Sequence, residues 1–162
     1  MVLVVSHTDH VTCQTRARLF LVMEYLSGGD LGHLLLTQGR FSPGRARLYA
    51  AEIAVAVIFL HQRSILHRDL KLDNVLLDSE GHVKIADLGM CRDRLPRGER
   101  AATFCGTPHY MAPEVVAGRG YGAAADWWSY GVLLYEMISG YTPFGAEEDA
   151  MVFREILGAE IR

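Results

Sequence analysis

The sequence has few cysteines, no excess charge of one sign and no long apolar run. The three cysteines, Cys13, Cys91 and Cys105, are odd in number and form no C-x-x-C pair, which argues against a disulfide framework or a cysteine-rich zinc site. Sixteen basic and 19 acidic residues give a net charge of −3, so the basic field typical of nucleic-acid-binding proteins is absent. The apolar segments are much shorter than the roughly 18 residues of a membrane span. We therefore expect a soluble, cytoplasmic protein that binds no nucleic acid and has no intrinsic membrane segment.

The overall composition is that of one globular domain. Of the 162 residues, 50% are apolar and 22% are charged, which excludes a wholly disordered chain. A chain of this length buries roughly two thirds of its extended surface on folding. No internal repeat, low-complexity tract or linker rich in proline and serine divides it.

Four segments have helical patterns with recognisable ends. Asp30 is a predicted N-cap for the first helix, and Gly39 is its predicted stop. Pro43 stands at a favoured first helical position of the second helix, whose stretch 53–60 is apolar all round and is predicted to lie deep in the core. The third helix should end at Gly140. The predicted helices cover residues 31–38, 43 to at least 60, 126–139 and 147–157.

Short strands are predicted between these helices. The apolar run 19–23 indicates a buried strand, and the segments 75–77 and 83–85 around the turn 78–81 indicate a hairpin. The segment 92–100 is polar and arginine-rich, and it is predicted to be a mobile loop. The expected fold class is therefore α+β and mainly helical.

The strongest chemical signal lies on either side of this hairpin. Asp69, Lys71 and Asn74 precede it and Asp87 follows it, so the hairpin can return Asn74 and Asp87 to the same end. An amide and a carboxylate placed there suit Mg²⁺, which takes oxygen ligands from a few protein groups and from substrate phosphates. An isolated Asp near an Asn is more often a turn or cap pair, but here a second carboxylate and a cation accompany them.

Three motifs in this region resemble those of the eukaryotic protein kinases. The segment His67-Arg68-Asp69-Leu70-Lys71-x-x-Asn74 is similar to the catalytic loop. Asp87-Leu88-Gly89 stands in the place of Asp-Phe-Gly, and Ala112-Pro113-Glu114 is similar to the end of the activation segment. The resemblance implies the hinge and the C-terminal lobe core of a protein kinase fold, with the upper lobe largely missing.

The resemblance extends over residues 12–162, whereas residues 1–11 fit the family poorly. The sequence contains no glycine-rich phosphate loop and no Val-Ala-Ile-Lys strand, so we expect a partial kinase domain that is inactive alone. Two departures from the family pattern occur within the matching part. Leu88 replaces the usual phenylalanine, and His109 stands where related kinases usually have glutamate.

The resemblance also implies catalytic roles. Asp69 would be the base that orients the substrate hydroxyl, and Lys71 would neutralise the transferring phosphoryl group. Asn74 and Asp87 would hold Mg²⁺. Thr107 would bridge Asp69 and Lys71; the alternative is a simple turn residue before Pro108. Lys71 and the Gly-Thr-Pro that contains Thr107 are typical of serine/threonine kinases rather than tyrosine kinases.

The segment 21–30 resembles the hinge of the kinase group that contains protein kinase C, Akt and the cyclic-AMP-dependent kinase. The segments 103–108 and 126–128 belong to the same group, and 71–78 and 89–91 favour protein kinase C and its near relatives. By this resemblance, residues in this segment and in 71–78 and 87–89 would contact bound ATP. They would supply the gatekeeper beside the adenine, the backbone contacts of the hinge, the side chain under the adenine ring and the contact to the ribose. The implied nucleotide-binding residues are Met23, Glu24, Leu26, Asp30, Leu76 and Asp87.

Regulation and substrate choice follow from the same resemblance. Thr103 matches an activation-loop phosphosite, which implies an upstream activating kinase, and Arg68 and Arg92 would pair with its phosphate. Three acidic residues match positions that meet basic residues beside the target Ser or Thr, although each one is also compatible with a cap, a loop charge or a helix-face residue. They are Asp30, Asp73 and Glu136.

These observations predict a serine/threonine protein kinase that transfers the γ-phosphoryl group of ATP to protein hydroxyls with the help of Mg²⁺. The alternative is a non-catalytic kinase fragment or pseudokinase that acts as a protein-binding module. Catalytic residues favour the first interpretation, and the missing phosphate loop favours the second for this chain alone.

Overall fold

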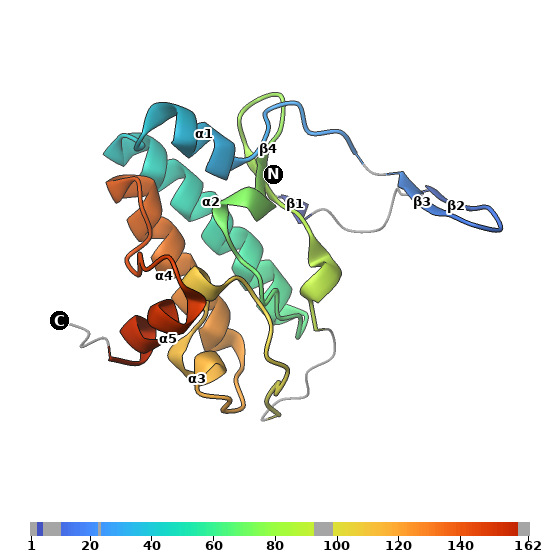
Figure 1. Cartoon of the computed structure of the whole chain (residues 1–162). Coiled ribbons are helices and arrows are strands. Elements are labelled where there is room, and N and C mark those ends of the chain that lie inside the picture. Colours follow the sequence, from blue (N-terminus) through green and yellow to red (C-terminus); the bar gives the residue numbers. More distant parts are fainter. Residues whose placement is uncertain (1–2, 5–10, 23, 93–98, 159–162) are drawn as a thin grey trace.

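The structure is a computed structural model that describes residues 3–4, 11–22, 24–92 and 99–158. Five α-helices and five short strands make up the regular structure of these residues (Figure 1). The helices are α1 (Leu31–Gln38), α2 (Pro43–Gln62), α3 (Pro113–Val116), α4 (Ala123–Ser139) and α5 (Asp149–Gly158). The strands are β1 (Leu3–Val4), β2 (Val11–Gln14), β3 (Leu19–Val22), β4 (Val75–Leu77) and β5 (Val83–Ile85). The expected α+β class, mainly helical, is confirmed.

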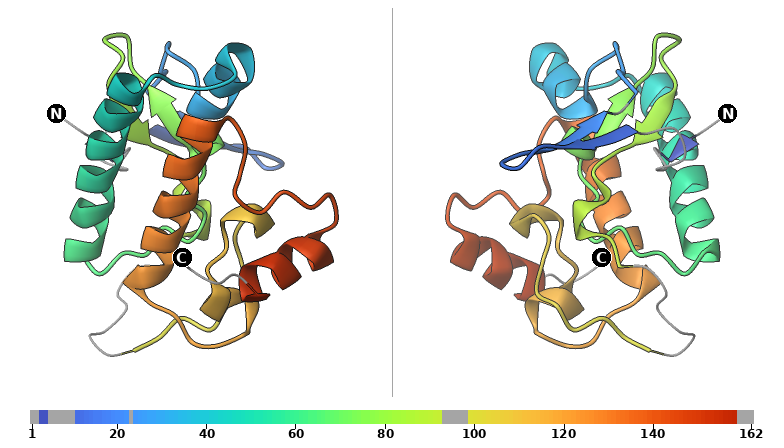
Figure 2. Two further views of the ribbon diagram at one scale, coloured as in Figure 1. Left: turned by 90° about the vertical axis from the view of Figure 1, so that its left-hand side faces the viewer. Right: turned by 90° about the vertical axis from the view of Figure 1, so that its right-hand side faces the viewer.

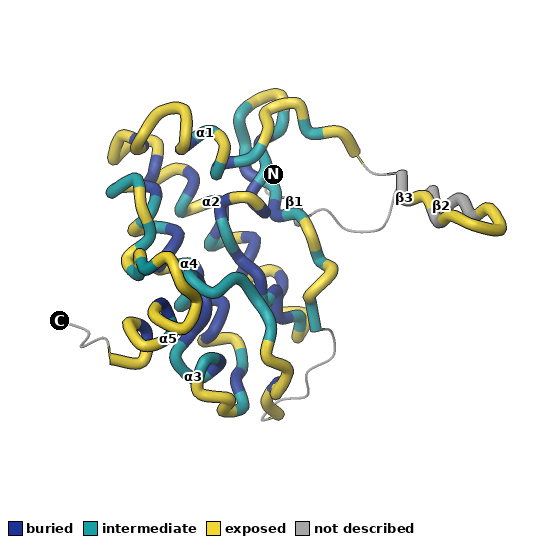
Figure 3. The backbone as a smooth tube through the Cα atoms, viewed as in Figure 1, coloured by how far each residue is buried: buried dark blue, intermediate teal, exposed yellow. Residues whose placement is uncertain are grey.

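The two long helices, α2 and α4, lie side by side and form the centre of the fold (Figures 1 and 2). The β4–β5 hairpin packs on α2, where Ile53 and Val57 meet Val83 and Ile85 in one buried cluster. Leu133 of α4 belongs to the same cluster. In Figure 3 buried stretches alternate with exposed ones along both helices, which therefore bury one side each. This packing holds the residues on both sides of the hairpin against a rigid core.

The strands form two small sheets. In the first, β4 pairs with β5 antiparallel, with Leu76 opposite Lys84, and β1 adds parallel to β5 with Leu3 opposite Lys84. In the second, β2 and β3 form an antiparallel hairpin that projects away from the helices (Figure 1). The predicted hairpin at 75–85 is confirmed, whereas β1 and β2 had no counterpart among the predicted elements.

The predicted helix ends are largely confirmed. The Asp30 carboxylate accepts a hydrogen bond from the His33 N–H at 2.7 Å, and the Ser42 hydroxyl accepts one from the Arg45 N–H at 3.4 Å. Gly140 closes α4 with φ 91°. Helix α4 begins three residues before the predicted start at residue 126, because three alanines, 123–125, are helical as well. Asp126 is therefore not at the end of the helix. It lies inside the first turns, where its carboxylate binds another segment.

Two predictions of burial are wrong. Phe20 of β3 is 46% exposed, because the β2–β3 hairpin does not pack on the core. In α2, Val55, Ile58 and Phe59 are exposed although their segment is apolar all round. Apolar periodicity could not tell which side of this helix has a partner.

The predicted loop at 92–100 lies mostly outside the described residues. No described helix is both long and apolar enough to cross a membrane.

Candidate active site

Asp126 anchors the segment that contains the predicted catalytic loop. Its carboxylate is 2% exposed and accepts hydrogen bonds from the His67 N–H at 3.0 Å and the Arg68 N–H at 2.9 Å. His61 Nε2 lies 2.7 Å from the same carboxylate. Burial favours the neutral acid, but these hydrogen bonds outweigh it and hold the pKa of Asp126 below its usual value. The charged carboxylate therefore stabilises the loop, in which Arg68 has the left-handed φ of 69°.

His67 connects this loop to the β4–β5 hairpin. Its Nδ1 accepts the Asp69 N–H at 3.3 Å, and its Nε2 lies 3.3 Å from the Ala86 carbonyl oxygen. Burial lowers the pKa of His67 despite the nearby carboxylates. The neutral ring with its proton on Nε2 satisfies both contacts. His67 therefore holds the catalytic loop and the β4–β5 hairpin at a defined distance from each other.

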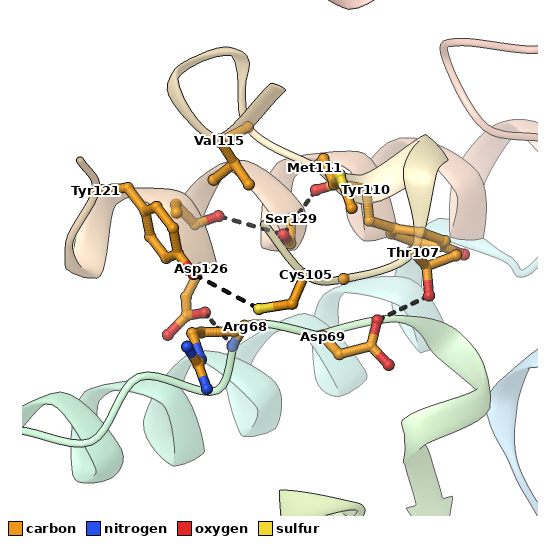
Figure 4. Close-up of a pocket in the computed structure, with 13 residues that line it drawn as sticks. Arg68, Asp69, Cys105, Thr107, Tyr110, Met111, Val115, Tyr121, Asp126 and Ser129 are labelled. Carbon is orange, nitrogen blue, oxygen red and sulfur yellow. Dashed lines mark hydrogen bonds between the residues drawn. The ribbon is translucent and has the colours of Figure 1, made fainter. Parts of the chain in front are cut away.

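Asp69 contacts the other three predicted catalytic residues, and Figure 4 shows it beside Thr107. Its carboxylate is largely buried and accepts a hydrogen bond from the Thr107 hydroxyl at 2.7 Å. The Lys71 ammonium lies 3.8 Å from the other oxygen, to which the Asn74 amide also donates at 3.2 Å. Asn74 in addition donates to the Asp69 carbonyl at 2.8 Å. The structure thus brings the four predicted catalytic side chains together, with Asp69 rather than Thr107 in contact with Lys71.

The activation segment reaches Asp69 through a close approach of two backbones. Gly106 has φ 116°, and a Cβ built on it would lie 2.8 Å from the Arg68 carbonyl oxygen. A larger residue would therefore clash and would also be strained in this conformation. Glycine at this position permits the next residue, Thr107, to reach the Asp69 carboxylate.

Asn74 and Asp87 lie at the open end of the β4–β5 hairpin, as predicted. The Ala86 N–H donates to the Asn74 carbonyl at 2.9 Å, one residue before Asp87. Asp87 is exposed, has φ 59°, and accepts the Gly89 N–H at 3.1 Å. Because the Asn74 amide nitrogen is bonded to Asp69, its side-chain oxygen remains as a ligand. One amide oxygen and one carboxylate fit Mg²⁺, which completes its shell with phosphate and water.

The end of the predicted hinge segment, residues 28–30, pairs with the outer edge of β4. The Gly28 N–H donates to the Leu77 carbonyl at 3.0 Å, and the Leu77 N–H donates to the Gly29 carbonyl at 2.8 Å. A Cβ on Gly28 would lie 2.6 Å from the Leu77 Cβ, so only glycine permits this contact. The pairing places Asp30 opposite Leu76, and two predicted nucleotide-binding residues therefore lie side by side.

The other predicted nucleotide-binding residues lie earlier in the hinge. The Lys84 ammonium is 2.7 Å from the Glu24 carboxylate, which ties the hinge to β5. Leu26 is half-buried. Met23, the predicted gatekeeper, lies outside the described residues.

The predicted phosphosite lies beside a cavity lined by the catalytic loop and the activation segment (Figure 4). Thr103 is exposed, and its carbonyl oxygen accepts a hydrogen bond from the Tyr121 hydroxyl at 2.8 Å. Arg68 lines the cavity with Tyr121 and donates to the Met90 carbonyl at 2.6 Å. Arg92 is half-buried and pairs with Leu66 through its backbone. No described contact joins either arginine to Thr103.

The three predicted substrate-recognition acids lie around α1 and α4. A Cβ built on Gly32 would lie 3.2 Å from Asp30 Oδ1 and 3.4 Å from Asp73 Cγ, so these carboxylates flank the first turn of α1. The Tyr110 hydroxyl donates to Glu136. Burial raises the pKa of Glu136, and the charge of Asp73 adds to this effect. Asp73 therefore lies near enough to influence both of the other acids.

Sequence reasoning missed the residues that hold the site in place. Asp126 was noted only as part of a group-specific segment, and no motif pointed to His61. Their contacts join residues 58 to 65 positions apart. The run Asp126-Trp127-Trp128 was the one available signal, because an ionisable residue inside an apolar helix needs a partner.

Comparison with known proteins agrees with this geometry. The sequence matches the protein kinase domain over residues 5–161, and the chain belongs to that family. It is 55% identical over 148 residues to mouse protein kinase C eta type and 52% identical over 149 residues to human protein kinase C delta type, with 91% of this chain covered in each case. It is also 56% identical over 145 residues to a putative protein kinase C delta type homolog of Drosophila melanogaster. The chain is thus similar to protein kinase C, and it spans about a fifth, 22%, of the length of these relatives.

Proposed function

We propose that this chain contains the catalytic centre of a serine/threonine protein kinase that transfers the γ-phosphoryl group of ATP to protein hydroxyls. The observation that carries the proposal is the cluster around Asp69. A buried carboxylate is oriented by the Thr107 hydroxyl and the Asn74 amide, with the Lys71 ammonium 3.8 Å away. Asp69 would accept the proton of the substrate hydroxyl, and Lys71 would neutralise charge on the transferring group.

The cofactors of this reaction are ATP and Mg²⁺. The Asn74 side-chain oxygen and the Asp87 carboxylate would hold the metal ion, which neutralises phosphate charge when bound. Half-buried Leu76 would contact adenine from β4, and Asp30 beside it would approach the ribose. The hinge residues Met23, Glu24 and Leu26 would contact the rest of the adenine ring.

The protein partners follow from charge. Asp30, Asp73 and Glu136 would attract substrates with Arg or Lys on the N-terminal side of the target Ser or Thr. An upstream kinase would phosphorylate exposed Thr103, and Arg68 and Arg92 would then pair with the phosphate. Because the odd set of cysteines favours a reducing compartment, we assign the activity to the cytoplasm.

A second candidate function is a binding module without catalysis. It is favoured by the exposed side chains of Val55, Ile58 and Phe59, which stand at i, i+3 and i+4 on one side of α2, because exposed apolar side chains that gather in a patch are typical of contact surfaces. The chain also lacks a glycine-rich loop in its sequence. We therefore expect the 162-residue chain alone to transfer phosphate no faster than its Asp69→Ala variant.

The experiment that tests catalysis uses the full-length protein with Mg²⁺-ATP and an arginine-containing peptide. Asp69→Ala should lower kcat roughly 10²–10⁴-fold, the contribution of a positioned base. Asp149→Ala, at the exposed start of α5, removes the same charge away from the site and should leave kcat unchanged. Equal activity of the wild type and Asp69→Ala would refute the proposed reaction and favour the binding module.

A further inference from the structure

Glu52, in the middle of α2, binds the turn end of the β4–β5 hairpin with both carboxylate oxygens. Oε1 lies 2.7 Å from His82 Nδ1, and Oε2 accepts the Val83 N–H at 2.7 Å. The Glu52 side chain is 12% exposed, and hydrogen bonds to a charged group in such surroundings are strong. Within the described part of the chain, these are the hydrogen bonds that join α2 to the hairpin.

The turn that Glu52 binds is itself rigid. The Asp78 carboxylate accepts the Glu80 N–H at 3.0 Å and the His82 N–H at 2.9 Å, and the Asp78 N–H donates to the His82 carbonyl at 3.0 Å. A movement of His82 therefore moves the whole turn. Because β4 and β5 are paired along their full length, it also moves the strands that follow.

The same helix holds the catalytic loop. Further along α2, His61 contacts Asp126, whose carboxylate binds the backbone of His67 and Arg68. Asp69 follows directly. Helix α2 thus contacts the hairpin through Glu52, and through His61 it contacts Asp126, the residue that anchors the catalytic loop.

Apolar packing alone does not determine the position of β5 along its own axis. Val83 and Ile85 are fully buried beside α2, but apolar contacts are non-directional and tolerate small shifts. The hydrogen bonds of Glu52 are directional. They fix the turn end of β5, and the Ala86–Asn74 backbone bond transmits this position to the open end.

We propose that Glu52 is a positioning residue for the metal ligands Asn74 and Asp87, an inference that rests on the proposed function. By holding the turn on α2, Glu52 supports from the far end of the hairpin the position that the Asn74–Asp69 and His67–Ala86 contacts give to its open end. The distance between the base and the metal ion then depends on a side chain that touches neither. The contact to His82 is part of this arrangement, because His82 belongs to the turn that Glu52 holds.

The test uses the 162-residue chain, with Mn²⁺ as the probe. Binding is followed by paramagnetic broadening of the Asn74 and Asp87 amide signals in NMR spectra. Glu52→Ala should weaken Mn²⁺ binding by up to about tenfold, the lower end of the effect of removing a group bonded directly to a metal ligand, because Glu52 acts on Asn74 and Asp87 only through the hairpin. Glu52→Gln should have a smaller effect, because glutamine keeps an acceptor for the Val83 N–H. Glu80→Gln removes the same charge from the exposed turn and should change nothing.

Amide hydrogen exchange gives a second readout that needs no metal. In Glu52→Ala, the Ala86 amide should exchange at least about tenfold faster, since the two charge-assisted hydrogen bonds that hold the hairpin on α2 are lost. The Met137 amide in α4 should exchange at its wild-type rate, which shows that the fold itself remains closed.

Several results would overturn the inference. Unchanged Ala86 exchange would do so, and so would an equal loss of Mn²⁺ affinity in Glu80→Gln. A lower unfolding midpoint with unchanged Mn²⁺ affinity would show that Glu52 only stabilises the fold. If Mn²⁺ broadens no signal of the wild type, the proposed metal site fails, and Ala86 exchange still decides the role of Glu52.

Discussion

Replacement of Asp126 is expected to destabilise the chain by an amount that depends on how many buried donors it leaves without an acceptor. The carboxylate accepts one hydrogen bond at Oδ1 from Arg68 and two at Oδ2, from His67 and His61. In Asp126→Asn the amide group must face one of the two backbone N–H groups, so one buried donor is orphaned at a cost of about 2 kcal/mol. Asp126→Ala orphans all three, and we expect a loss of about 4 kcal/mol.

Urea unfolding near pH 7, followed by tryptophan fluorescence, measures these losses. Both tryptophans, Trp127 and Trp128, are adjacent to Asp126 in sequence. Glu155→Gln on α5 is the control, because this exposed side chain has no described partner. A free energy of unfolding of Asp126→Asn within about 0.5 kcal/mol of the wild type, the usual range of neutral surface changes, would refute the reasoning.

Acid unfolding provides an independent check with a defined sign. The pKa of Asp126 is lowered in the folded chain, so its contribution is complete above the unfolded pKa of about 3.9. The contribution is lost as the pH falls through the lower folded pKa. The stability difference between the wild type and Asp126→Asn should therefore shrink below about pH 4. A difference that persists to about pH 2 would contradict this assignment.

Three further predictions concern single side chains. Thr103→Ala in the full-length kinase should lower activity at least about tenfold, because a phosphate adding about −1.5 to −2 charges would no longer pair with Arg68 and Arg92; unchanged activity in a peptide assay would contradict this. Tyr110→Phe removes a hydrogen bond that lowers the pKa of Glu136, so an NMR titration should show that pKa rise further, and a fall would be inconsistent. Burial raises the pKa of Cys91 to about 12, so N-ethylmaleimide should modify Cys91 at least about tenfold more slowly than Cys105 near neutral pH. Peptide mass mapping measures the two rates, and equal rates would disprove the prediction.

The features that the sequence predicted correctly are determined by neighbouring residues. Asp30 caps α1 through a bond to an amide three residues away, and the 75–85 hairpin closes around a five-residue turn, 78–82. Asp69, Lys71 and Asn74 are likewise close in sequence, so their motif was visible as a string. In such cases the spacing along the chain already sets the spacing in space.

The features that were missed depend on contacts between distant residues. Leu3 pairs with Lys84, and Glu52 binds His82, and neither contact leaves a periodic pattern in the sequence. The exposure of Ile58 could not be predicted either, because an apolar helix shows no difference between a face with a partner and a face without one. These features depend on how distant segments pack together. A single sequence carries little direct information about that packing.

The two sheets differ in how their edges are protected, and this difference bears on aggregation. In the core sheet β1 covers one edge of β5, and the hinge bonds at Leu77 cover the outer edge of β4. Among the described strands, β2 and β3 pair only with each other, so the outer edge of each remains open to a strand from another molecule. Arg16 and Arg18 at the tip of this hairpin carry like charges that oppose such an addition. Intermolecular strand pairing in concentrated solutions should therefore begin at β2–β3, and it should be promoted by salt that screens the two arginines.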